Sequence, residues 1–226
     1  MAAPSISHSL LAPKRSWILL FIVAACLIFI GLGRLPLLEP DEGRNAEVAR
    51  EMLLTHDWIT PHFNGLAYLD KPTFLFWTIA GSFRAFGINE WTARFPSALA
   101  AMATLLLVWL MAARMCGEGT GLRAGIILVT APLFFGFARF VIFDMALTLW
   151  VSVALYCFWL NSRRAFASKG LDALAFAAMG LATLTKGPVG FLLPLLTLLV
   201  YGALAGRMRE LKKVHWLTGW LVLFAV

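Results

Sequence analysis

Acidic and basic residues suited to group-transfer chemistry stand in three places in this sequence. One is the segment Glu39-Pro40-Asp41-Glu42-Gly43-Arg44, directly after a long apolar run. The others are the pair Asp70-Lys71 and the more distant residues Asp144 and Lys186. Carboxylates can act as bases or offset positive charge, and a lysine beside lipid can bind a phosphate. Acids next to a membrane helix are costly unless they are solvated or used, so the first segment is the leading candidate.

Each of these residues also has a purely structural interpretation. Asp41 and Asp144 stand where helices are expected to begin, and an aspartate there can cap the helix. Asp70 can be a solvated turn residue. Lys71 and Lys186 can extend toward lipid headgroups as ordinary interfacial lysines. The residue types alone leave both interpretations open.

The spacing of histidines and cysteines disfavours a metal or disulfide site. His56 and His62 are separated by a proline turn, which is poor spacing for metal ligands. Cys26, Cys116 and Cys157 lie within or at the end of apolar runs, and none has a partner at metal-binding spacing. We therefore expect neither a disulfide nor a zinc–thiolate site.

The composition is that of an integral membrane protein. Hydrophobic residues make up 61% of the chain, against roughly 45–50% in soluble proteins. Charged residues make up 14% and fall between the apolar runs, as membrane spans and loops require. The net charge of +7 comes from residues that punctuate apolar segments. A basic nucleic-acid-binding protein would group them with polar neighbours, so we expect no nucleic-acid partner.

The order of apolar runs predicts an all-α, polytopic transmembrane helical bundle. The expected spans are 17–33, 93–113, 122–138, 145–160, 171–185, 188–205 and a truncated one at 216–226. Lys14 and Arg15 precede the first run, which is too long and too rich in Ile, Leu and Phe for a signal peptide. The last run has about 11 residues where roughly 20 are needed. We therefore expect residues 1–226 to be the amino-terminal transmembrane domain of a protein whose carboxy-terminal part is absent.

The apolar run 73–88 is predicted to lie at the membrane surface. About 16 residues at about 1.5 Å each reach about 24 Å, short of a hydrocarbon core of about 30 Å. If it crossed, the basic clusters 163–169 and 207–213 would lie outside, against the positive-inside rule. The prediction is an external loop 34–91 with interfacial helices 41–54 and 73–87. The external side then holds nine of the 12 acidic residues: Glu39, Asp41, Glu42, Glu47, Glu51, Asp57, Asp70, Glu90 and Asp144.

Residues 39–96 resemble one family of membrane enzymes. The stretch begins EPDEGRNAEVAREM and continues through LAYLDKPTFLFW to TARFPSALAA. It is similar to the first external loop and second span of bacterial aminoarabinose transferases and their protein O-mannosyltransferase relatives, which are GT-C glycosyltransferases. The later ARFVIFDMALTLW and LATLTKGPVG match the same family in order and spacing. One departure is Asn45, at a position that is often aromatic in the aminoarabinose enzymes.

The resemblance implies roles for particular residues. Members of the family transfer a sugar from a polyprenyl-phosphate carrier at the outer face of the membrane. Asp41 would then face the reaction centre, with Glu42 beside it as the second member of the Asp-Glu pair. Asp144 would be the second acidic position of the site. We take these three as the candidate catalytic residues.

Five further positions are implied as binding residues. Tyr68, Asp70 and Lys71 match the tyrosine, acidic and lysine positions that precede the interfacial helix. In the family the lysine is thought to bind the lipid phosphate, and the acid has been linked to a divalent metal. Lys186 matches a lysine near the same face, and Arg44 completes the candidate substrate-binding set. A divalent metal at Asp70 is the only cofactor expectation.

The expected function is sugar transfer from a polyprenyl-phosphate donor at the periplasmic face of the bacterial inner membrane. Lipid A is the leading acceptor, and a protein or another glycan is the alternative. An alcohol acceptor would need Asp41 as a base, whereas an ionised phosphate acceptor would not. A secondary transporter is disfavoured because the centres of the spans carry no charge and the acids gather at one face. A non-catalytic membrane subunit is the third hypothesis.

Overall fold

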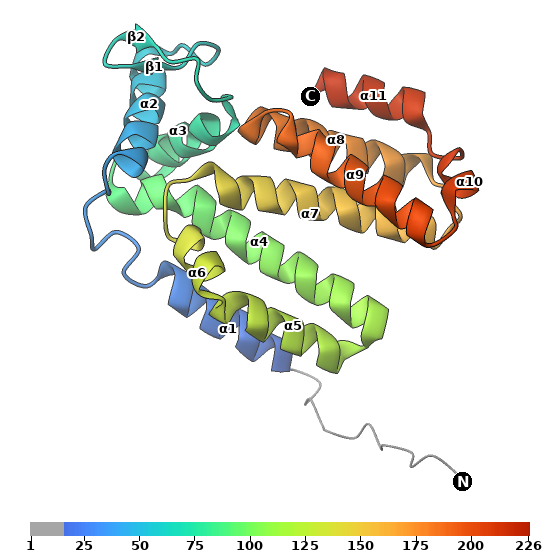
Figure 1. The fold of residues 1–226 in the computed structure, drawn as a ribbon. Coiled ribbons are helices and arrows are strands. Elements are labelled where there is room, and N and C mark those ends of the chain that lie inside the picture. The colour runs from blue at the N-terminus through green and yellow to red at the C-terminus, as the bar shows by residue number, and fades with distance from the viewer. Residues whose placement is uncertain (1–15) are drawn as a thin grey trace.

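The computed structural model describes residues 16–226, so Lys14 and Arg15 lie outside the described residues. The described chain is almost entirely helical, which confirms the predicted all-α class (Figure 1). The helices are α1 (Ser16–Phe29), α2 (Asp41–Thr55), α3 (Phe74–Phe86), α4 (Glu90–Cys116), α5 (Glu118–Thr130), α6 (Pro132–Ala138), α7 (Phe143–Ser162), α8 (Lys169–Lys186), α9 (Val189–Leu204), α10 (Met208–Leu211) and α11 (Trp216–Ala225). The strands β1 (His62–Phe63) and β2 (Leu66–Ala67) form one antiparallel hairpin.

The long helices form a bundle around α4 and α7. These two pack on each other, α5 packs on α4, and α8 packs on α7. Helices α9 and α11 cover α8, while α1 lies against α4 and α5. Figure 1 shows α2, α3 and the hairpin together at one end of this bundle, with α10 at the opposite end. The residues predicted to do chemistry therefore belong to one end of the molecule.

Helices α2 and α3 are fixed to the bundle by a shared apolar core. Its buried members come from α2, α3, the start of α4 and the segment that begins α7: Ala46, Val48, Ala49, Met52, Leu75, Phe76, Ile79, Ala80, Phe83, Ala93, Val141 and Phe143. The rings of Phe76 and Phe143 meet edge to face with centroids 5.6 Å apart. Burying such large side chains contributes about 1.5–3 kcal/mol each. Helices α2 and α3 are thus packed into the fold and do not form a loose loop.

The transition between α3 and α4 follows local sequence signals. Gly87 ends α3 with φ +85°, a conformation that glycine adopts without steric cost. Asn89 and Thr92 then form a capping box that begins α4. The short connection directs α3 back along the end of the bundle, where one of its faces is buried.

Within residues 16–226, two helices, α4 and α7, are long and apolar enough to cross a membrane. The count rises to three if α5 and α6 are one span. The run 122–138 was predicted as one span, but the structure divides it into α5 and α6 with a bend of 69°. Pro132 lacks a backbone N–H and disfavours helical geometry at the preceding residue, and Ala131 is extended here. The segment 55–65 contains β1 and leads through Asn64-Gly65 into β2.

Candidate active site

Five of the predicted site residues form a continuous chain of contacts on the open side of α2. Asp41 and Arg44 form an ion pair with 2.5 Å between Oδ1 and Nη2. The guanidinium of Arg44 lies 5.9 Å from the centroid of the Tyr68 ring. The Tyr68 hydroxyl donates to Oδ2 of Asp70 at 3.2 Å, and Nζ of Lys71 is 3.3 Å from the same oxygen. Residues spread over thirty positions in the sequence thus share one polar surface.

The hairpin positions the second half of this chain. The carboxylate of Glu51, near the end of α2, accepts hydrogen bonds from the backbone N–H groups of Asn64 at 2.7 Å and Gly65 at 3.1 Å. The N–H of Tyr68 donates to the Pro61 carbonyl at 2.7 Å. These bonds tie the turn to α2, so Tyr68 and the residues after it return to the first turn of the same helix.

The local charges set the protonation states of this surface. The hydrogen bond and positive charge of Lys71, together with the Tyr68 hydroxyl, hold the pKa of Asp70 below its usual value. Burial raises the pKa of Tyr68, and the negative charge of Asp70 raises it further against the opposing effect of Arg44. Tyr68 is therefore a neutral hydrogen-bond donor near pH 7, and Asp70 is ionised. The surface presents two cations and two carboxylates, paired as Arg44 with Asp41 and Lys71 with Asp70.

A second acid–base pair stands at the same end of the bundle. Asp144 lies in the first turn of α7 and Lys186 is the last residue of α8, and their Oδ1 and Nζ atoms are 2.7 Å apart. Each side chain is 39% exposed. The alternative interpretation of Asp41 and Asp144 was that each caps its helix, but neither side chain makes a capping hydrogen bond. The N-cap positions are Ile142 and Pro40, and neither helix start has a side-chain cap bond.

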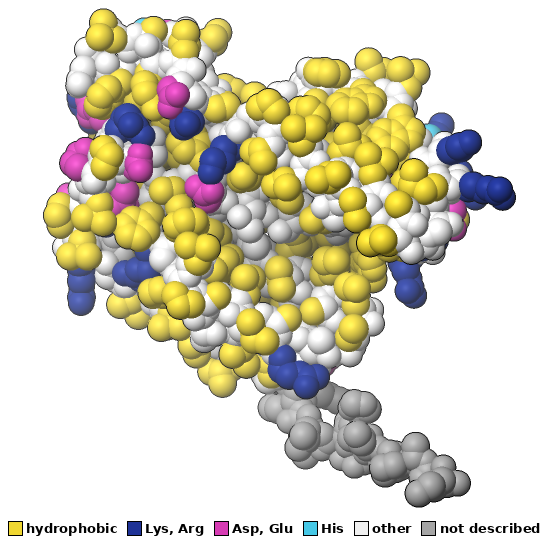
Figure 2. Space-filling model, viewed as in Figure 1, with side chains coloured by type: hydrophobic (Ala, Val, Ile, Leu, Met, Phe, Trp, Pro, Cys, Tyr) yellow, Lys and Arg dark blue, Asp and Glu magenta, His cyan; other side chains and the backbone are white. Residues whose placement is uncertain are grey.

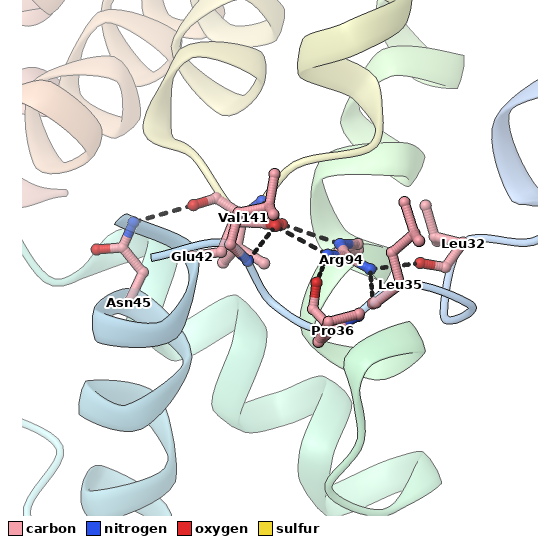
Figure 3. Close-up of polar contacts among 8 residues, drawn as sticks. Leu32, Leu35, Pro36, Glu42, Asn45, Arg94 and Val141 are labelled. Atoms are coloured by element: carbon pink, nitrogen blue, oxygen red, sulfur yellow. Dashed lines mark hydrogen bonds and ion pairs between the residues drawn. The ribbon is translucent and has the colours of Figure 1, made fainter. Parts of the chain in front are cut away.

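Glu42 has a different setting from Asp41, because it is buried at 2% exposure. Figure 3 shows its carboxylate facing Arg94 of α4, with bonds of 2.9 Å from Nε and 2.8 Å from Nη2. The same carboxylate accepts the N–H groups of Leu38 at 3.0 Å and Val141 at 2.9 Å. Burial alone would raise the pKa of Glu42, but these bonds outweigh it and lower the pKa. With both oxygens occupied, Glu42 supports the site and does not face the open surface.

Arg94 and Arg139 support this end of the molecule in a way that the sequence analysis missed. Besides Glu42, the Arg94 guanidinium bonds the carbonyl oxygens of Leu32, Leu35 and Pro36. Arg139 donates to carbonyl oxygens at the end of α1: Leu27, Ile28 and Ile30. An arginine within an apolar run needs a buried partner, and that signal marks Arg94 in the sequence.

The expectation of a divalent metal at Asp70 stays a prediction, and no cluster of metal-ligand side chains surrounds Asp70 in the described residues. Within 16–226 no group of three or more His, Cys, Asp or Glu side chains could hold a metal ion. The neighbours of Asp70 are a phenol and an ammonium, and an ammonium repels a metal ion. His56 is exposed, and His62 lies 4.0 Å from Asp57.

An apolar cavity adjoins the polar surface. It has a volume of about 510 Å³ and lies between α3, α4 and α7. Phe74, three residues after Lys71, forms part of its wall. Other lining residues are Thr78, Phe86, Ala100, Leu149 and Trp150. The wall of the cavity thus begins three residues after Lys71, at the beginning of α3.

Comparison with known proteins assigns this arrangement to a family. Residues 70–226 match the family described as dolichyl-phosphate-mannose-protein mannosyltransferase. The chain belongs to this family. The family match includes Asp70, Lys71, Asp144 and Lys186. The contacts above connect Asp70 and Lys71 to α2 through Tyr68 and Arg44, and they join Asp144 to Lys186.

Individual relatives in the family are bacterial transferases. The undecaprenyl phosphate-alpha-4-amino-4-deoxy-L-arabinose arabinosyl transferase of Pseudomonas paraeruginosa is 34% identical over 203 residues, covering 88% of this chain and 37% of the relative. The enzyme of the same description from Edwardsiella ictaluri is 33% identical over 199 residues, covering 86% and 36%. The chain thus spans little more than a third of the length of these relatives.

Solved structures show that the fold is that of the same group. The crystal structure of ArnT from Cupriavidus metallidurans bound to undecaprenyl phosphate matches with a TM-score of 0.88 at 33% identity, covering 95% of this chain and 40% of ArnT. The apo structure matches with a TM-score of 0.87. These matches and the apolar helices identify a membrane protein with the helical architecture of this family.

Proposed function

We propose that the protein is a glycosyltransferase that moves a sugar from a polyprenyl-phosphate carrier to an acceptor at the periplasmic face of the bacterial inner membrane. The observation that carries the proposal is the polar surface that holds Arg44 and Lys71, near the apolar cavity whose wall includes Phe74. A lipid phosphate needs both features, a site for its charge and an apolar site for its chain. The fold match to a transferase bound to undecaprenyl phosphate supports the same ligand class.

In the proposed reaction, the bond between the sugar C1 and the carrier phosphate oxygen breaks as a bond from C1 to the acceptor oxygen forms. The carrier leaves as polyprenyl phosphate, and its developing negative charge is offset by Lys71 and Arg44. Arg44 is paired with Asp41 before the donor binds. A phosphate that engages Arg44 would release the Asp41 carboxylate toward the sugar or the acceptor.

The role of Asp41 depends on the acceptor. With an alcohol acceptor, as in protein or glycan O-glycosylation, Asp41 accepts the hydroxyl proton. With a phosphate acceptor on lipid A, no proton needs removal near pH 7, and the carboxylate stabilises positive charge on the sugar. The arabinosyl transferase relatives favour lipid A, and the description of the family favours a protein acceptor.

The positions of the buried charged side chains disfavour a secondary transporter. The buried charged side chains in residues 16–226 are Glu42, Arg94 and Asp172. Each lies near the start of a helix, while transporters place ionisable groups on broken helices near the middle of the membrane.

The test is transfer by the full-length protein in liposomes, with a purified polyprenyl-phosphate sugar as donor. Lipid A and an acceptor peptide are supplied separately, and products are identified by mass spectrometry. We expect a sugar adduct on lipid A and release of polyprenyl phosphate. An adduct on the peptide alone would move the proposal to protein glycosylation. Donor that stays intact with each acceptor, in a protein that retains its fold, would contradict the proposed function.

A further inference from the structure

The first turn of α2 carries two interleaved pairs of polar residues on different sides. Asp41 and Arg44 lie on the open side and pair with each other. Glu42 and Asn45 lie on the buried side, with 2% and 3% exposure. Residues three apart on a helix share a face, so one turn presents a reactive side and a supporting side at once.

The supporting side holds both backbone hydrogen-bonding groups of one residue, Val141. The Val141 N–H donates to Oε1 of Glu42 at 2.9 Å, and its carbonyl accepts Nδ2 of Asn45 at 2.9 Å (Figure 3). The Val141 side chain is fully buried in the core shared by α2 and α3. The segment between α6 and α7 is therefore held on α2 through the backbone and the side chain of Val141. These contacts of Val141 with Glu42, Asn45 and the shared core form a clamp.

This clamp determines where Asp144 stands. Val141 is two residues before the start of α7 at Phe143, and Asp144 lies in the first turn of α7. A shift of Val141 along α2 would carry this turn with it, together with the ion pair between Asp144 and Lys186. The position of Val141 along α2 thus fixes where the Asp144 carboxylate lies relative to the Asp41 carboxylate.

The Asn45 side chain makes one hydrogen bond in the described structure, and that bond is the one to Val141. Its amide oxygen is buried and has no partner within residues 16–226. A buried unpartnered oxygen is costly, and an apolar side chain of similar size would avoid that cost. The favourable contribution of the Asn45 side chain is therefore the hydrogen bond that its amide nitrogen donates to the Val141 carbonyl.

We propose that Asn45 is a positioning residue of the transferase site, which acts by holding the Val141 carbonyl and so keeps Asp144 in register with Asp41. The inference rests on the proposed function. It predicts an effect on the chemical step rather than on donor binding, because Lys71 and Arg44 lie on the open side of α2.

The decisive variants are Asn45→Leu, which removes the donor at nearly constant volume, and Asn45→Gln, which keeps a donor on a longer side chain. The matched control is Asn161→Leu. Asn161 is also fully buried and bonds Ser168 and Asp172, but it lies near the end of α7 at the opposite end of the bundle. Replacing it tests the cost of losing a buried amide without altering the clamp.

We expect Asn45→Leu to lower kcat per folded molecule at least tenfold, with KM for the donor lipid within twofold of wild type. Asn45→Gln should recover part of kcat, and Asn161→Leu should retain kcat within twofold whatever its thermal stability. If Asn45→Leu does not fold, Asn45→Ser takes its place, because the shorter hydroxyl cannot span the same distance. Equal kcat values for the Asn45 and Asn161 variants would overturn the proposal.

A distance measurement separates this inference from the proposed function. Spin labels at Thr55 on α2 and Thr148 on α7, both exposed, report the separation of the two helices by pulsed electron spin resonance. The native cysteines are first replaced by alanine: Cys26, Cys116 and Cys157. Asn45→Leu should shift or broaden the distance distribution, and Asn161→Leu should not. If wild type transfers no sugar, the proposed function fails, and an unchanged distribution in Asn45→Leu would then overturn the clamp independently.

Discussion

Lys71 has the most charge-specific role in the proposed site, because it stands at the junction between the polar surface and the apolar cavity. We predict that Lys71→Ala raises KM for the lipid-linked sugar and lowers kcat. The decrease in kcat/KM should be roughly tenfold or more, since a charged hydrogen bond contributes about 1.5–3 kcal/mol and about 1.4 kcal/mol is a factor of ten. Lys71→Arg should retain part of the activity, because charge survives while geometry changes. Steady-state kinetics with the full-length protein in liposomes measure both.

Arg84→Ala is the matched control for this prediction. Arg84 is an exposed cation on the same helix, in the last turn of α3, and it has no assigned role in the site. If the activity depends on a positive charge at the position of Lys71 and not merely on α3, removing the Arg84 charge should leave KM and kcat unchanged. Wild-type kinetics for Lys71→Ala would reduce Lys71 to an interfacial anchor and remove the phosphate-binding role.

The two exposed carboxylates, Asp41 and Asp144, make the second residue-scale prediction. We expect Asp41→Asn and Asp144→Asn to abolish transfer with little loss of folded protein, since neither side chain caps its helix. The control is Glu47→Gln on α2, which breaks an ion pair with Arg50 in the same helix. Product formation is followed by mass spectrometry, and the folded fraction by gel filtration. Near-normal turnover in both aspartate variants would restrict them to structural roles.

At the scale of elements, the pair of Glu42 and Arg94 joins α2 to α4. Both side chains are almost fully buried, so removing one leaves an uncompensated charge that costs about 3–5 kcal/mol. We predict that Glu42→Gln and Arg94→Met each lower the apparent Tm in detergent. The double variant should lose less than the sum of the two, because residues in contact are coupled. Additive losses would mean that the ion pair does not hold the two helices together.

The lowered pKa of Glu42 gives the same pair a pH dependence. A group whose pKa is lower in the folded state stabilises the fold above its unfolded value, here the ordinary 4.5. That contribution disappears as the pH falls through the folded-state pKa. The apparent Tm of wild type should therefore fall more steeply below about pH 4.5 than that of Glu42→Gln. Parallel curves for the two proteins would assign the acid sensitivity to other carboxylates.

The helices of this protein are local features, and the sequence predicts their positions well. The run 145–160 lies within α7, and the predicted helix 41–54 coincides with α2 except at its last residue. The partners across the site are not local. Arg94 meets Glu42 from 52 positions away, and Asn45 reaches Val141 over 96 positions. Hydrophobic periodicity carries no information on such pairs, so the burial of Glu42 and its ion pair with Arg94 were not predictable from its place beside Asp41.

At the scale of the whole molecule, charge is divided between the two ends of the bundle. The end with α2, α3 and the start of α7 carries acids and bases together, and Figure 2 shows this mixture over α2 and α3. The other end, around α10, carries mainly Lys and Arg in the same view. Its exposed cations are Arg163, Arg164, Lys169, Arg209, Lys212 and Lys213. The positive-inside rule therefore supports the proposal that this end faces the cytoplasm and that the site lies on the periplasmic side.

The proposed membrane topology rests on this separation of charges between the two ends of the bundle and on the packing of α3. Its 13 residues reach about 20 Å, short of the hydrocarbon core of about 30 Å, and its buried face packs on α2. We therefore predict that reporter fusions after Trp58 and after Gly87 both give a periplasmic signal, while a fusion after Arg164 gives a cytoplasmic one. Paired alkaline phosphatase and green fluorescent protein fusions, with matched expression, measure this. A cytoplasmic signal at Gly87 with a periplasmic one at Trp58 would mean that α3 crosses the membrane. It would then separate from α2, and the polar surface that joins Lys71 to Asp41 would not exist.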